Sequence, residues 1–238
     1  MSWQDTPRSD RISIDNTRNE GIEKSVPERG LLITFEGTDG SGKSTQIKEL
    51  RRRILAAGKA VHLTYEPGGT VVGEAVRKLV KHTPEASAIT PEAELLLFAA
   101  SRAQLVREVI QPKLAAGEHV IADRFLDSTT VYQGMARPLN LRKVRQINEF
   151  AVDQTLPDIT FLLDMDSALA LSRVRSRGAG DRMDKLEPKF YETVIKGYLK
   201  IARKEKERFA VIDATQSVGK TSDDIWDTLT GRFDGVFS

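Results

Sequence analysis

The sequence contains no cysteine, few aromatic side chains and no long apolar run. The lack of cysteine excludes a disulfide scaffold, a zinc site with thiolate ligands and catalysis by a thiol. Apolar runs such as residues 95–100 fall far short of the roughly 18 residues that a membrane span requires. A formal net charge of +2 argues against general nucleic-acid binding. We therefore expect a cytoplasmic protein with no membrane and no nucleic-acid partner.

The 238 residues suffice for one α/β domain that buries a full core without disulfides or a structural metal. The first 29 residues differ from the rest, because they are polar, mix acidic with basic side chains and include Pro7 and Pro27. They lack the apolar stretch of a signal peptide and carry too many acidic residues for a transit peptide. We predict a disordered N-terminal arm at residues 1–29 and one folded domain at residues 30–238.

From Gly30 onward, short β-branched and aromatic runs alternate with segments of helical period, which is typical of βαβ units. Strands are predicted at residues 31–36, 61–65, 120–123, 160–164 and 210–213. Helices are predicted near residues 44–57, 71–82, 91–114, 141–156, 167–177, 188–208 and 221–233. Pro112 should kink or restart the third helix. The pattern predicts an α/β fold in three layers, with a doubly wound, five-stranded parallel sheet covered by helices on both faces.

A phosphate-binding motif follows the first predicted strand and precedes a predicted helix, and it matches G-x-x-x-x-G-K-[ST]. Its glycines let the backbone curl so that N–H groups point at phosphate oxygens, and the helix N-terminus adds its dipole. We expect Lys43 to reach the β- and γ-phosphates and Ser44 to offer its hydroxyl to Mg²⁺. The predicted ATP-binding residues are Gly37, Thr38, Asp39, Gly40, Ser41, Gly42, Lys43, Ser44 and Thr45.

Several other nucleotide-binding signatures are missing from the sequence. There is no Asn-Lys-x-Asp sequence to read guanine, and no Asp-x-x-Gly switch element outside the phosphate-binding motif. This argues against a GTPase. The His-Arg-Asp and Asp-Phe-Gly pair of protein kinases is also absent, which argues against a protein acceptor.

Polar residues at the end of the third predicted strand indicate where a second substrate binds. The chain there reads Asp123-Arg124-Phe125, and the carboxyl end of a strand in an open α/β sheet faces the ligand crevice. Arg124 is suited to hold a phosphate bidentately, and Asp123 to serve the Mg²⁺ shell through water. The alternative is an ion pair between neighbouring residues.

The preceding predicted helix places Phe98 and Arg102 four residues apart, hence on one face. A ring and a guanidinium in this arrangement could clamp a planar base. The alternative is that Phe98 belongs to the core, as an aromatic residue in an apolar helix usually does.

Four arginines and two glycines lie within residues 173–184, after the fourth predicted strand. A charged run is usually a solvated face. Here it interrupts a helical pattern at a glycine hinge, so we predict a small Arg-rich lid at about residues 173–187. An arginine on such a lid would bring positive charge to the migrating phosphoryl group and exclude water.

Taken together, these motifs resemble thymidylate kinases of the bacterial type across roughly residues 30–231. The resemblance rests on Phe-Glu-Gly-Thr-Asp-Gly-Ser-Gly-Lys-Ser-Thr at 35–45, Glu-Pro-Gly-Gly-Thr at 66–70, Leu-Phe-Ala-Ala-Ser-Arg at 97–102, Asp-Arg-Phe at 123–125, Tyr-Gln-Gly at 132–134 and Ile-Asp-Ala-Thr at 212–215. It implies a P-loop nucleoside monophosphate kinase domain over residues 30–238, a homodimer, and transfer of the γ-phosphoryl group of ATP to dTMP with Mg²⁺, giving dTDP and ADP.

The resemblance also implies roles for individual residues. Phe98 would stack on thymine, Arg102 would hydrogen-bond the base, and Thr129 and Gln133 would help to read it. Tyr132 would crowd the 2′ position of the sugar, and Asp39 would lie near the 3′-hydroxyl and the metal. Arg77 and Arg124 would grip the acceptor phosphate. The residues expected to act in catalysis are Lys43, Arg177, Arg124 and Asp39, with Ser44 and Asp123 serving the metal.

One departure from the family pattern leaves an alternative open. Tyr65 stands where the family usually has arginine before Glu-Pro-Gly-Gly, which removes a positive charge near the acceptor. A related kinase that acts on dUMP or a modified pyrimidine would fit this change. A third reading is a nucleotide-binding regulator that has lost catalysis, against which the intact Lys43, Ser44 and Arg124 speak.

Overall fold

The computed structural model describes residues 29–176 and 188–237. The strands are β1 (Leu32–Glu36), β2 (Val61–Tyr65), β3 (His119–Asp123), β4 (Ile159–Asp164) and β5 (Phe209–Asp213). The α-helices are α1 (Lys43–Ala56), α2 (Val71–His82), α3 (Pro91–Leu105), α4 (Gln111–Ala115), α5 (Leu126–Tyr132), α6 (Leu141–Val152), α7 (Ser167–Ser176), α8 (Pro188–Lys204) and α9 (Val218–Arg232). The arm predicted at residues 1–29 lies outside the described residues except for Arg29, whose guanidinium pairs with Asp158 at 2.9 Å.

The strands form one parallel sheet of order β2-β3-β1-β4-β5, which confirms the predicted fold class. β1 lies between β3 and β4, and Phe35 pairs in register with Asp123 on one side and Phe161 on the other. The carboxyl ends of β1 and β3 are therefore neighbours. The phosphate-binding motif after β1 and the Asp-Arg-Phe segment after β3 start from the same edge of the sheet.

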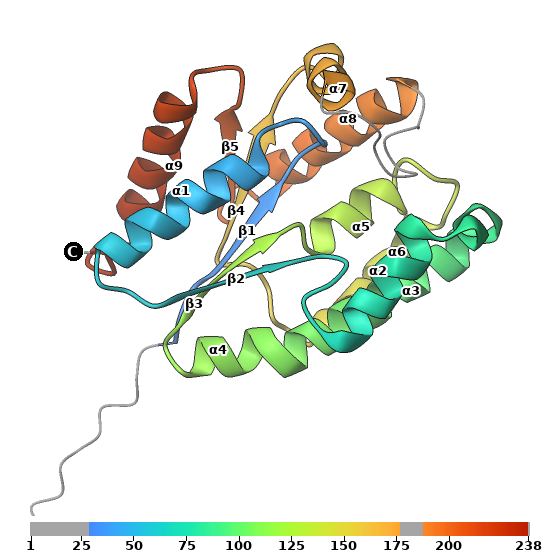
Figure 1. Ribbon diagram of the computed structural model, residues 1–238, viewed down its shortest axis with the longest axis horizontal. Helices are drawn as coiled ribbons and strands as arrows, with labels where there is room; N and C mark the ends of the chain where they lie inside the picture. The colour runs from blue at the N-terminus through green and yellow to red at the C-terminus, as the bar shows by residue number, and fades with distance from the viewer. Residues whose placement is uncertain (1–28, 177–187, 238) are drawn as a thin grey trace, which may run out of the picture.

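Helices cover both faces of the sheet (Figure 1). On one face, Ile33 and Phe35 pack with residues of α1 and α9, and on the other face Leu32 packs with residues of α3 and α4. A further cluster joins α5 and α8 to β4 and β5. This alternation along β1 follows from the two-residue period of a strand, and it explains why both sides of the strand are apolar. Among the described residues, no helix is long and apolar enough to cross a membrane.

The predicted restart of the third helix at Pro112 is confirmed, because a π-helical turn, Val106–Ile110, separates α3 from α4. Proline has no N–H to donate and its ring clashes with the carbonyl four residues earlier, so the turn widens there. Other local features differ from the sequence prediction: α6 ends at Val152 rather than at residue 156, where Asp153 and Gln154 adopt positive φ. The short helix α5, directly after β3, was not predicted.

Candidate active site

The phosphate-binding loop connects β1 to α1 and is shaped by its glycines. Gly37, Gly40 and Gly42 have positive φ, and a Cβ on Gly37 would lie 2.7 Å from the carbonyl oxygen of Leu163. Lys43 is buried at the start of α1, where its Nζ donates to the carbonyl oxygens of Gly37 at 3.1 Å and Thr38 at 2.9 Å. The loop thus has the curled backbone, the helix N-terminus and the lysine that an anionic phosphate chain requires.

An ion pair links this loop to the end of β3. Arg124 Nη2 donates to Asp39 Oδ1 at 2.8 Å, and Lys43 Nζ lies 3.9 Å from the same oxygen. Burial would raise the pKa of Asp39, but the charges of Arg124 and Lys43 outweigh it and hold that pKa below its ordinary value. Burial and repulsion by Arg124 lower the pKa of Lys43, while Asp39 opposes them. Arg124 therefore pairs with Asp39 and not, as in the alternative, with its neighbour Asp123.

Arg124 adopts a backbone conformation that is unusual for a residue with a side chain. Its φ is 71°, in the left-handed region, and its N–H donates to the carbonyl oxygen of Phe35 at 2.9 Å. Such a conformation costs on the order of 1–2 kcal/mol and persists where the surroundings enforce it. The turn directs the guanidinium back towards the phosphate-binding loop.

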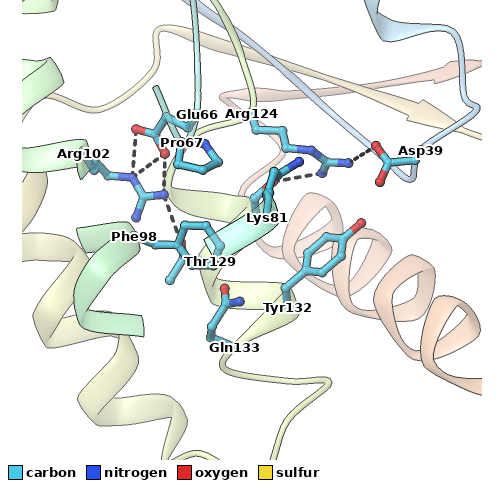
Figure 2. Close-up of a pocket in the computed structure, with 11 residues that line it drawn as sticks. Asp39, Glu66, Pro67, Lys81, Phe98, Arg102, Arg124, Thr129, Tyr132 and Gln133 are labelled. Atoms are coloured by element: carbon cyan, nitrogen blue, oxygen red, sulfur yellow. Dashed lines mark hydrogen bonds and ion pairs between the residues drawn. The ribbon is translucent and has the colours of Figure 1, made fainter. Parts of the chain in front are cut away.

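A cavity that is open to solvent lies beside this ion pair. It is bounded by the phosphate-binding loop, the segment after β2, α2, α3, the end of β3 and α5, and the side chains converge on it (Figure 2). All the residues predicted to bind dTMP line it, with the exception of Arg77. Its lining residues are Asp39, Glu66, Pro67, Lys81, Phe98, Arg102, Arg124, Ser128, Thr129, Tyr132 and Gln133.

Arg77 lies just behind the cavity wall. Its Nη1 donates to the carbonyl oxygen of Pro67 at 2.9 Å, and its guanidinium lies over the ring of Tyr65, 5.1 Å from the centroid. The hydroxyl of Tyr65 in turn donates to Glu74 at 2.6 Å. Tyr65 therefore holds Arg77 rather than facing the cavity itself.

Arg102 is almost fully buried, and most of its donors are used within the protein. Its Nε donates to Glu66 Oε2 at 2.9 Å, its Nη2 to Thr129 Oγ1 at 2.9 Å, and its Nη1 to Asn148 Oδ1 at 2.8 Å. Burial raises the pKa of Glu66, and Arg102 opposes that shift. Arg102 thus ties α3 to the segment after β2 and to α5, while its guanidinium still forms part of the cavity wall.

The aromatic residues of the cavity, Phe98 and Tyr132, are not fully packed or hydrogen-bonded by the rest of the described protein. Phe98 is half-buried and belongs to none of the apolar clusters of the described residues, which argues against the alternative of a core residue. Tyr132 lies under the Arg124 guanidinium at 5.3 Å, and its buried hydroxyl has no hydrogen-bond partner among the described residues. Gln133 donates from Nε2 to Glu94 at 2.8 Å, which fixes the orientation of its amide. A ligand with a flat face and polar edges would complement this set.

The two residues predicted to serve a metal lie at the mouth of the phosphate-binding loop and at the end of β3. Ser44 is exposed in the first turn of α1, and Asp123 ends β3. Both offer oxygen ligands, which suit Mg²⁺. The described residues contain no group of three His, Cys, Asp or Glu side chains that could hold a metal alone. Mg²⁺ in kinase sites needs only one or two protein oxygens, because substrate phosphates and water complete its shell.

Some residues at the site carried no assignment from the sequence. Glu66 belongs to the Glu-Pro-Gly-Gly-Thr motif, but its pairing with Arg102 spans 36 positions and leaves no local signal. Lys81 lines the cavity from α2, one turn after Arg77, and that four-residue spacing was the signal available. Arg177 and most of the predicted lid, residues 177–187, lie outside the described residues, between the end of α7 and the start of α8.

A parallel sheet of this order, a Gly-Lys-Ser loop at the helix after its central strand and a second cavity at the adjacent strand define a P-loop kinase that acts on small molecules. The family model "Thymidylate kinase" matches residues 35–225. The chain therefore belongs to the thymidylate kinase family, whose members are phosphotransferases.

Individual relatives agree with this assignment. The chain is 45% identical over 204 residues to a thymidylate kinase from Deinococcus radiodurans, covering 86% of this chain and 98% of that protein. It is 45% identical over 202 residues to one from Bifidobacterium longum subsp. infantis, covering 84% of each. Among solved structures, a thymidylate kinase from Ehrlichia chaffeensis superposes with a TM-score of 0.67 at 33% identity, covering 85% of this chain and 99% of that one.

Proposed function

We propose that this protein transfers the γ-phosphoryl group of ATP to the 5′-phosphate of dTMP, giving dTDP and ADP, as a step in dTTP synthesis. The observation that carries the proposal is the 2.8 Å contact between Asp39 and Arg124, which joins a phosphate-binding loop to a cavity lined by aromatic and polar side chains. The donor phosphates and the acceptor phosphate would meet at this contact.

The chemistry needs charge and positioning rather than a general base. A phosphate oxygen of dTMP attacks the γ-phosphorus of ATP, a new P–O bond forms, and the bond to the β-phosphate oxygen breaks to release ADP. The second pKa of a phosphate monoester is about 6, so dTMP is mostly dianionic at neutral pH and has no proton to lose. Two polyanions must instead be held in line, which requires cations on several sides.

The donor side of the site consists of residues 37–45. The backbone of Gly37 to Thr45 would hold the phosphates, and Lys43 would exchange the two loop carbonyls for the β- and γ-phosphate oxygens. A bound phosphate would restore the pKa of Lys43, which burial lowers in the free protein. Ser44 would hold Mg²⁺ directly and Asp123 through water, and the ion would neutralise charge on the γ-phosphate.

The acceptor side combines a cationic end with a base-binding end. Arg124 would bind the phosphate of dTMP, Arg77 would support it, and the predicted lid residue Arg177 would close over the migrating group. Lys81 adds a further positive charge from α2. The acceptor contacts of Arg124 would replace part of its pairing with Asp39, whose carboxylate is then placed for the sugar 3′-hydroxyl.

The base would lie against Phe98. The polar edge of the base would meet the hydroxyl of Thr129, the amide of Gln133 and the Nη1 proton of Arg102 that Asn148 does not use. Tyr132 would approach C2′ of the sugar and so favour deoxyribose. Glu66 supports these contacts because it fixes the plane of the Arg102 guanidinium.

We further propose that the protein forms a homodimer through α2, α3 and α6. These helices pack next to one another, and Leu79, Leu96 and Phe150 lie on them with 38%, 57% and 81% of their surfaces exposed. A second copy that covered this face would bury apolar surface on both chains by the same contacts. Light scattering should give twice the chain mass for the parent and the chain mass for Phe150→Glu. A monomeric parent would overturn the proposal.

The acceptor is tested by ADP release with Mg-ATP and a panel of dTMP, dUMP, dCMP, dGMP, AMP and no acceptor. Release concentrated on dTMP, with less on dUMP and little in the blank, is expected. A preference for dUMP or another monophosphate would instead support the related kinase suggested by Tyr65. ATP binding without turnover on any acceptor would support the regulator.

A further inference from the structure

Glu36, the last residue of β1, is a fully buried carboxylate with no role in the reaction described above. Its Oε1 accepts from the backbone N–H groups of Phe125 at 2.9 Å and Ser128 at 3.2 Å. Its Oε2 accepts from the hydroxyls of Ser128 and Tyr198, each at 2.7 Å. These four hydrogen bonds offset part of the large cost of burying a carboxylate.

The first two bonds give α5 a cap that its own sequence does not provide. Phe125 is the N-cap residue of α5 and has no side-chain hydrogen bond to the helix. Ser128 is the third residue of the helix, where an N-cap side chain would ordinarily accept a hydrogen bond. Glu36 takes over that function from a strand 92 positions away. The same helix carries Thr129 and Tyr132 into the cavity.

The other two bonds extend the contact to α8. The Tyr198 hydroxyl lies 2.9 Å from Ser128 Oγ and accepts from Arg124 Nη1 at 3.4 Å. The rings of Tyr198 and Tyr132 meet edge to face with centroids 6.4 Å apart. Glu36 therefore joins β1, α5 and α8 directly behind Arg124.

We propose that Glu36 is a positioning residue for the acceptor substrate, acting through α5 and Tyr198 to fix Arg124 and Tyr132 at the acceptor end of the site. The inference rests on the proposed function and deepens it, because it assigns the placement of the acceptor contacts to a residue that touches neither substrate. Donor-side residues 37–45 are held mainly by their own backbone and by Lys43, so binding of ATP should depend on Glu36 much less.

The two oxygens of the Glu36 carboxylate accept from different groups, backbone N–H groups on one and hydroxyls on the other, and this decides the choice of substitutions. In Glu36→Gln the amide oxygen can keep both backbone N–H groups, but the NH₂ group cannot accept from the two hydroxyls. Tyr198→Phe removes one of those hydroxyls and leaves the Glu36 carboxyl group in place. Thr193→Val is the control on α8, because the Thr193 hydroxyl donates to the carbonyl oxygen of Lys189 in the same helix at 2.9 Å and not to Glu36.

The test compares the parent, Glu36→Gln, Tyr198→Phe and Thr193→Val as full chains in steady-state kinetics and in calorimetric binding of dTMP alone. We expect Glu36→Gln and Tyr198→Phe to lower kcat/KM for dTMP by about tenfold or more, and to weaken dTMP binding, because misplacement of about 1 Å has effects of that order. KM for ATP should stay near the parent value in both variants, and KM for both substrates and the dTMP affinity should stay near the parent values in Thr193→Val.

Two results would overturn the inference. One is a parent-like kcat/KM and dTMP affinity in both variants. The other is an equal loss for ATP and dTMP together with a lowered unfolding midpoint, which would make Glu36 a residue of general stability only. If Glu36→Gln does not fold, Tyr198→Phe decides. A parent that binds dTMP but does not phosphorylate it would overturn the proposed function instead, and the binding data would still decide the inference.

Discussion

The side chains of Asp39 and Arg124 join the two halves of the site, with Arg124 Nη2 donating to Asp39 Oδ1 at 2.8 Å. Asp39 comes from the loop after β1 and Arg124 from the end of β3, and these strands are neighbours in the sheet. The Asp39 carboxylate neutralises the charge of Arg124 until the acceptor phosphate binds. An arginine poised in this way needs no large rearrangement to exchange a carboxylate for a phosphate.

Replacing Lys43 by methionine should abolish most of the turnover. The side chain would keep its length but could not pair with the β- and γ-phosphates, and we expect kcat to fall at least about 100-fold. Steady-state ADP release with dTMP measures the effect. Lys48→Met on the same helix is the control, since Lys48 is exposed. A Lys43→Met enzyme with near-parent kcat would contradict the assignment of the phosphate-binding loop.

Replacing Phe98 by alanine should weaken the binding of dTMP and leave the binding of ATP unchanged. Stacking of a base on an aromatic ring contributes about 1–3 kcal/mol, so KM for dTMP should rise about tenfold. Phe98→Leu keeps the apolar contact without the π face and should fall between the parent and alanine. The proposed stacking would be wrong if alanine, leucine and phenylalanine gave the same KM for dTMP.

Replacing Arg102 by methionine should destabilise the protein strongly. The substitution leaves the buried Glu66 carboxylate without its cation, and breaking such a pair costs about 3–5 kcal/mol. Urea unfolding measures this loss. Arg52→Ala breaks an exposed pair with Glu49 and should cost less than about 1 kcal/mol. In the double variant with Glu66→Gln, the loss should be clearly smaller than the sum of the single losses.

The sequence contained enough local information for the strands, the phosphate-binding loop and the placement of Phe98 and Arg102 on one face of α3. Each of these depends on residues close together in the chain, such as Phe98 and Arg102 one turn apart. The parallel order then brought the loop and Arg124 to one edge of the sheet, as predicted from strand ends alone.

What the sequence did not predict depends on distant partners. Helix α5 was missed because its capping group is Glu36, at the end of another element. The burial of Arg102 was missed because Glu66 and Asn148, 36 and 46 positions away, occupy its donors. No periodic pattern encodes pairings of this kind.

Glu36 should also give the stability of the protein a specific dependence on pH. Burial and repulsion by Asp127 raise the pKa of Glu36 to about 7, against the lowering effects of Arg124, Ser128 and Tyr198. The folded state thus holds a proton that the unfolded state releases near its ordinary pKa of 4.5. The contribution of Glu36 to the unfolding free energy is therefore fully present below pH 4.5 and is lost as the pH rises through about 7.

The measurement compares unfolding free energies of the parent and Glu36→Gln across that range of pH. Titrations common to both proteins cancel in the difference, and glutamine does not titrate. The parent should lose stability relative to the variant as the pH rises from acid to neutral. A difference that stays constant with pH would contradict the raised pKa.

The most direct test of the proposed function follows the phosphoryl group itself. The purified protein is incubated with Mg²⁺, dTMP and ATP labelled at the γ-phosphorus, and the products are separated. The account predicts that the label moves into dTDP in step with ADP formation, with little inorganic phosphate and no labelled product when dTMP is omitted. Label that is released as inorganic phosphate, or that stays in ATP while dTMP is bound, would contradict it.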